Sequence, residues 1–113
     1  MFIVLLDEPC LFVFGSPDDA VREIEPIDAE SEIRVAYDDA GVPYRVEWVR
    51  PNRYGRSLFG LIRSVEPGEY WLVPAGPPDP GGLVKLLESH PDHTNPPEAK
   101  ADLDALLERL RAV

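Results

Sequence analysis

The sequence lacks the cysteines for a disulfide and the long apolar segments that would insert into a membrane. Cys10 is the only cysteine among 113 residues, so no intrachain disulfide can form, and a reducing compartment suits such a protein. No apolar run approaches the roughly 20 residues of a membrane-spanning helix. The apolar start ends at Asp7 and Glu8, whereas a signal peptide needs a basic beginning and a longer apolar run. The sequence therefore predicts a cytoplasmic protein that contacts no membrane.

Sequence motifs typical of catalysis are also missing. There is no glycine-rich phosphate loop, no nucleophile elbow and none of the cysteine and histidine spacings of zinc sites. His90 and His93 lie on either side of Asp92 in a proline-rich segment, but that segment offers no obvious fourth ligand for a metal. We therefore expect no catalytic residue, no metal and no cofactor.

What is present is enough for one folded domain. A chain of 113 residues with 44 % hydrophobic residues can bury a core without metals or disulfides, and it has no room for two domains. We expect residues 1–113 to form a single α+β domain.

Acidic residues dominate the charge, and they are unevenly distributed. The net charge is −10, with eleven acids and two arginines between Asp7 and Asp39. The next segment, Ala40 to Val65, has one acid and five arginines, a net of +4. Because phosphate backbones repel an acidic protein, we expect no nucleic-acid partner. We expect Arg50, Arg53 and Arg56 to balance the acidic face or to contact a carboxylate or phosphate of a partner.

The first third of the chain carries clear local signals. Two short apolar runs, residues 2–6 and 11–14, predict strands. Ser16 followed by Pro17 and two aspartates is typical of a helix start, so we expect a helix from Ser16 to Glu25, ended by Pro26.

The segment from Asp28 to Gly41 permits two interpretations. With a period of two, Ile33, Val35 and Tyr37 share one face of a strand that turns at Gly41 into a second strand. With a period of 3.6, Ala29, Ile33, Ala36, Tyr37 and Ala40 form one face of a helix. The hairpin is preferred because the strand that follows needs a neighbour.

The second half of the chain predicts three helices and one further strand. Residues 50–56 resemble a loop, and Leu58, Leu61, Ile62 and Val65 repeat at helical spacing after Ser57. Residues 69–74 are strand-like, and helices are expected over residues 83–89 and 98–112. Leu103, Leu106, Leu107 and Leu110 mark the buried face of the last helix. The predicted fold is α+β, with a small, mostly antiparallel sheet packed against the C-terminal helices and one helix near the N-terminus.

The stretch from Phe14 to Val49 resembles a known class of bacterial proteins. Its elements are residues 14–20 (FGSPDDA), 25–28 (EPID) and 36–41 (AYDDAG). They are similar to a pattern among small acidic immunity proteins encoded beside polymorphic toxins. The resemblance implies a non-catalytic protein that binds and blocks a cognate toxin.

The acidic surface is the predicted partner-binding site. Dense charge of one sign speeds association with an oppositely charged protein, and a basic toxin domain is such a partner. A regulatory or adaptor domain and a small enzyme of unrecognised type are the alternative functions. The acids expected to contact the partner are Asp18, Asp19, Glu23, Glu30, Glu32, Asp38 and Asp39.

Overall fold

The computed structural model describes residues 1–7, 10–57, 62–89 and 93–112. Six strands form one sheet in the order β7-β4-β3-β1-β2-β8, and β5 pairs with β6 in a separate ladder. The fold is α+β with a mostly antiparallel sheet, as predicted, and β2–β8 is a parallel pair within it. The elements are β1 (Phe2–Leu5), β2 (Leu11–Phe14), α1 (Pro17–Glu23), α2 (Pro26–Glu32), β3 (Val35–Asp38), β4 (Pro43–Arg50), β5 (Arg53–Ser57), β6 (Ile62–Glu66), β7 (Glu69–Pro74), α3 (Pro80–Ser89), β8 (Thr94–Asn95), the 3-10 turn η1 (Pro97–Ala99) and α4 (Lys100–Arg111).

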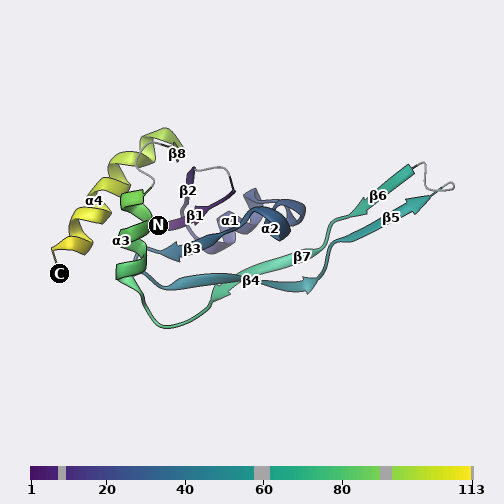
Figure 1. Ribbon diagram of the computed structural model, residues 1–113, viewed down its shortest axis with the longest axis horizontal. Helices are drawn as coiled ribbons and strands as arrows, with labels where there is room; N and C mark the ends of the chain where they lie inside the picture. Colours follow the sequence, from purple (N-terminus) through teal and green to yellow (C-terminus); the bar gives the residue numbers. More distant parts are fainter. Residues whose placement is uncertain (8–9, 58–61, 90–92, 113) are drawn as a thin grey trace.

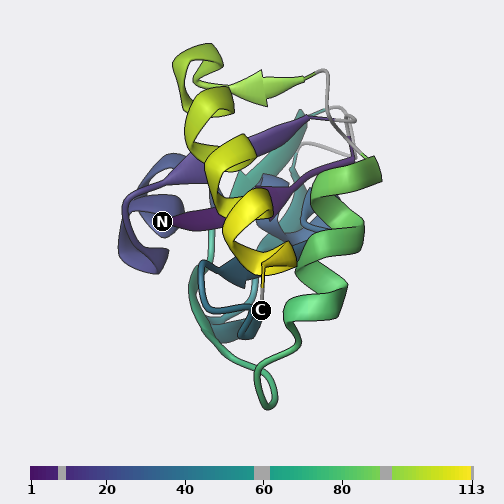
Figure 2. The same ribbon diagram turned by 90° about the vertical axis from the view of Figure 1, so that its left-hand side faces the viewer.

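The central strand β1 serves two separate cores, one on each face of the sheet. Phe2 and Val4 are fully buried in a core that includes residues of α1 and α2. Ile3, pointing to the opposite face, is fully buried among leucines of α3 and α4. Figure 2 shows α3 and α4 lying side by side over that face. Burial on both faces explains why β1 is a continuous apolar run.

The leucine stripe of α4 faces the sheet, as predicted. Leu103 and Leu106 are buried, and Leu107 and Leu110 are partly buried against the same core. The stripe therefore holds α4 to the sheet mainly through its first two leucines.

The helix predicted near the N-terminus is present but shorter. The Ser16 hydroxyl accepts a hydrogen bond from the Asp19 N–H at 3.1 Å, which caps α1. The helix ends at Glu23, two residues before the predicted end. Pro26 was expected only to stop this helix, but it is the first residue of a second helix, α2.

Each interpretation of residues 28–41 was correct for part of the segment. The preferred hairpin is confirmed as β3 and β4, joined by a turn in which Gly41 has a φ of 83°. The Asp38 carboxylate accepts hydrogen bonds from the N–H groups of Ala40 and Val42, both at 3.0 Å, and so fixes the turn. The helical alternative applies only to α2, which ends at Glu32.

The loop and helix predicted from residues 50 to 65 are wrong. Residues 53–57 and 62–66 are the antiparallel strands β5 and β6, hereafter called the arm. Two members of the supposed helical stripe, Leu58 and Leu61, lie outside the described residues. The arm follows β4 and leads into β7, so strand pairing decides its conformation and the helical spacing of its apolar residues does not.

The arm gives the molecule its elongated shape. The principal dimensions are 60 × 28 × 20 Å, and Figure 1 shows the arm projecting from the end of the body that α2 covers. Over the described ranges, no helix is long and apolar enough to cross a membrane.

Candidate functional site

The predicted acidic residues come from two parts of the fold, a pair of helices and a turn. Five of them belong to α1 and α2, the consecutive short helices that cover one face of the sheet. The other two, Asp38 and Asp39, lie in the turn between β3 and β4. The five acids of the first group are Asp18, Asp19, Glu23, Glu30 and Glu32.

On α1, two of the three acids present their carboxylates to solvent. Asp18 and Glu23 are exposed, and neither forms a salt bridge within the described part of the chain. Asp19 differs, because its carboxylate accepts a hydrogen bond from the Arg22 guanidinium three residues later. Asp18 and Glu23 are therefore the acids of this helix that a cationic partner reaches without competition.

Glu30 of α2 is tied to the base of the arm. Its carboxylate accepts hydrogen bonds from the Asn52 side-chain amide at 2.9 Å and from the Tyr54 hydroxyl. These bonds favour the charged form, so they lower the pKa of the Glu30 carboxyl from its ordinary value, with Tyr54 the larger cause. The same contact raises the pKa of the Tyr54 phenol. The carboxylate stays charged and exposed, but its hydrogen bonds are used to position the arm.

The acids of the β3–β4 turn make contacts within the protein. Asp38 fixes the turn through the two backbone hydrogen bonds described above. The Asp39 carboxylate lies 3.5 Å from the N-terminal ammonium group of Met1. Glu32, which ends α2, is half-buried. Contacts within the protein thus account for Asp38 and Asp39. The predicted acids that remain for a partner are those of α1 and α2.

A groove that the sequence did not predict lies beside α1. It has a volume of about 470 Å³ and is bounded by β2, by the segment after β8 and by both N-terminal helices. Its wall is about half apolar, with Leu6, Phe12, Phe14 and Ile24, and its polar part includes two carboxylates, Glu23 and Asp28. Asp28 was not among the predicted site residues, because the groove is assembled from segments that are far apart in the sequence.

Two arginines of the basic segment lie at the base of the arm. Arg50 and Arg53 are exposed, and both line a shallow hollow of about 350 Å³ with Glu66 and two prolines. In the strand register Arg50 is opposite Glu69, and Arg53 is opposite Glu66. Opposite charges at facing positions stabilise a ladder, so these two arginines have a structural explanation.

Tyr70 of β7 connects the end of α1 to the sheet. Its hydroxyl donates a hydrogen bond to the Ile24 carbonyl, which follows α1, at 2.6 Å. Burial, with a further contribution from the Asp28 charge, raises the pKa of Tyr70 to about 12. The phenol is therefore a neutral donor that fixes the end of α1 near the groove.

Among the described residues, no group of three or more histidine, cysteine or acidic side chains could hold a metal ion. Of the imagined histidine site, His90 and Asp92 lie outside the described residues, and His93 is exposed. The exposed acids of α1 and the groove thus remain as candidate binding surfaces.

Comparison with known proteins gives no relative. No family model, no curated protein and no solved structure matches this chain.

Proposed function

We propose that this chain is a non-catalytic protein-binding protein, acting in the cytoplasm as an immunity protein that binds and blocks a cognate bacterial toxin. The observation that supports the proposal is the exposure of two acids of α1, Asp18 and Glu23, which are free of salt bridges within the described ranges. The groove adds apolar surface beside Glu23.

A face of this kind suits a basic partner. Many toxins that act on nucleic acids carry cationic clefts for phosphate, and an acidic surface placed over such a cleft excludes the substrate. Charge complementarity mainly accelerates the encounter, whereas affinity depends on a few buried contacts. The groove, with aromatic residues and two carboxylates, can supply one such contact by taking an arginine or lysine side chain with its apolar stem.

The proposed partner-binding surface includes only some of the seven acids predicted from the sequence. Asp18 and Glu23 belong to it most directly, with Asp28 added from the groove. Asp38 and Asp39 are expected to contribute only to the long-range field, because the turn and the N-terminus engage their carboxylates.

The test is co-expression with the product of the adjacent gene. We expect the two proteins to purify as a complex, and the chain to restore growth if that product is toxic. Asp18→Lys with Glu23→Lys should weaken both effects. The matched control, Glu98→Lys with Glu108→Lys, makes the same charge change at exposed positions near and on α4. Absence of a complex, or equal effects of the two variants, would contradict the proposal.

A further inference from the structure

Phe12 is a half-buried aromatic residue of β2 that packs in neither of the two cores. Its neighbours on the strand, Leu11 and Val13, both pack in the core beneath α3 and α4. Because side chains alternate along a strand, Phe12 points to the opposite face of the sheet, where it lines the groove beside α1. The groove therefore has an aromatic ring in its wall that is not needed to fill a core.

The groove also carries two carboxylates that the protein does not neutralise. Glu23 of α1 is exposed and Asp28 of α2 is half-buried. Over the described ranges neither side chain accepts a hydrogen bond or forms a salt bridge, and no lysine or arginine is among the described residues of the wall. A carboxylate partly removed from water gains from an opposite charge, so the groove favours a cation.

An organic cation fits this groove better than a metal ion. Ca²⁺ takes roughly six to eight oxygen ligands, whereas the described residues hold no group of three or more histidine, cysteine or acidic side chains for a metal. The apolar half of the wall, with Leu6, Phe12 and Ile24, has nothing to offer a hydrated ion, but it can cover a carbon chain. The volume of about 470 Å³ exceeds the needs of a single ion and lies in the range of small-ligand sites.

Part of the groove wall is fixed in advance. The carbonyl of Ile24, a buried residue of the wall, accepts the hydrogen bond from the Tyr70 hydroxyl at 2.6 Å. On the other side, Phe12 is paired with Asn95 of β8 in the sheet. A wall that is already ordered lowers the entropic cost of binding.

We propose that the groove binds one arginine side chain of the partner protein and prefers it to lysine. A guanidinium group is planar and weakly hydrated, so it stacks on an aromatic ring while donating paired hydrogen bonds to a carboxylate. Phe12 supplies the ring, and Glu23 and Asp28 supply the acceptors. The origin of the arginine rests on the proposed function, because the basic partner supplies it, whereas the preference for arginine depends on the groove alone.

The first experiment asks whether the groove distinguishes the two basic side chains. The isotope-labelled full chain is titrated with the acetylated amides of arginine, lysine and citrulline, and the backbone amide shifts are followed by NMR. Lysine matches the charge of arginine, and citrulline matches its shape. We expect arginine to shift Phe12, Glu23 and Asn95 and to bind roughly fivefold or more tightly than either of the other two. Equal binding of arginine and lysine, or arginine shifts away from the groove, would overturn the proposal.

Two variants separate the contributions of the ring and the charges. Phe12→Leu keeps an apolar side chain without the ring, so the advantage of arginine over lysine should disappear. Glu23→Gln with Asp28→Asn keeps the shapes and removes both charges, so arginine should bind roughly tenfold or more weakly. A Phe12→Leu variant with the full preference for arginine would refute the stacking, and wild-type binding by the uncharged variant would refute the site.

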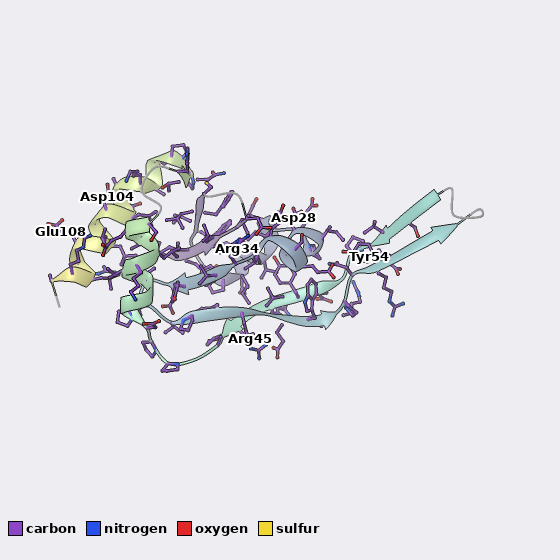
Figure 3. The ribbon with its side chains drawn as sticks, viewed as in Figure 1. Asp28, Arg34, Arg45, Tyr54, Asp104 and Glu108 are labelled. Carbon is purple, nitrogen blue, oxygen red and sulfur yellow. The ribbon has the colours of Figure 1, made fainter. Side chains whose placement is uncertain are left out.

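A matched control for the charge change lies on α4. Asp104→Asn with Glu108→Gln removes the same two charges at exposed positions, and Figure 3 shows both residues on α4, well apart from Asp28 on α2. This variant should bind arginine like the wild type. An equal loss in the control would show that the net charge attracts the ligand, and it would overturn the proposal.

A second experiment asks whether the partner supplies the arginine. In the complex with the product of the adjacent gene, Asp28→Asn should raise the dissociation rate roughly tenfold and change the association rate little, because a contact inside the groove forms after the encounter. A wild-type dissociation rate would refute the partner's arginine and leave the proposed function standing. Binding of the arginine amide without any complex would instead overturn the proposed function and leave the groove to a free guanidinium compound.

Discussion

The Asn52 side-chain amide donates a hydrogen bond to the Glu30 carboxylate at 2.9 Å, which joins α2 to the base of the arm. The same amide group donates to the Pro26 carbonyl at 2.9 Å, and the Asn52 side-chain oxygen accepts from the Gly68 N–H at 2.7 Å. Asn52 is 8 % exposed, the one polar residue in the buried class across the described ranges. One side chain thus fixes where the arm leaves the body.

Removing this side chain should destabilise the protein. Asn52→Ala leaves the buried Gly68 N–H without its partner, and we expect a loss of about 2 to 3 kcal/mol in the free energy of unfolding. Asn52→Asp keeps the shape and the acceptor but places a second carboxylate against Glu30, so it should be destabilising as well. Urea unfolding measures both. A loss of less than about 0.5 kcal/mol for Asn52→Ala would show that the junction does not depend on this residue.

The Glu30 contact also predicts a pH dependence. The hydrogen bonds lower the pKa of this carboxyl in the folded state below its ordinary value of 4.5. Such a group adds stability above its unfolded pKa, and this contribution disappears as the pH falls through the folded pKa. Glu30→Gln keeps an acceptor but cannot ionise. The difference in unfolding free energy between wild type and Glu30→Gln should therefore shrink as the pH drops below 4.5, and a constant difference would refute the coupling.

Gly68 should tolerate no side chain. A Cβ there would lie 2.2 Å from the Arg50 carbonyl oxygen and 2.6 Å from the Pro51 carbonyl carbon, so the two strands at the base of the arm would have to separate. We expect Gly68→Ala to cost about 1 to 3 kcal/mol or more. Gly76→Ala is the matched control, since its Cβ would meet Pro43 at an ordinary 3.8 Å. Thermal unfolding of the two variants compares them directly, and equal melting temperatures would contradict the close packing.

The leucines of α4 should differ in their contributions. Leu106 is 2 % exposed, whereas Leu110 is only partly buried. Leu106→Ala should cost about 2 to 5 kcal/mol, as core truncations do, and Leu110→Ala clearly less. Denaturant melts of both variants provide the comparison. Similar small losses would mean that α4 is peripheral to the core.

Local sequence signals predicted the parts of the fold that local physics determines. The cap at Ser16 and the turn at Gly41 were predicted from residues that hydrogen-bond or bend the chain over a few positions. The apolar periodicity of α4 likewise gave its buried face. In each case the deciding interaction lies within one element or one turn.

The arm and the groove could not be found in this way. The strands of the arm depend on pairing between residues 53–57 and 62–66, which lie between β4 and β7 in the sequence, and the helical spacing of the leucines there was misleading. The groove gathers Leu6, Phe12, Glu23, Asp28 and Pro96 from distant parts of the chain. The role of Glu30 was also hidden, because its partner Asn52 is 22 residues away.

The central claim is that the acids of α1 meet a basic partner. Its most direct test is the association rate with the product of the adjacent gene, measured by stopped-flow mixing at several salt concentrations. We predict a rate that falls steeply with salt, and a slower, less salt-dependent rate for Asp18→Lys with Glu23→Lys. Glu98→Lys with Glu108→Lys should stay close to the wild type. An unchanged rate and salt dependence in the α1 variant would contradict the claim and reduce the acidic face to a solvated surface.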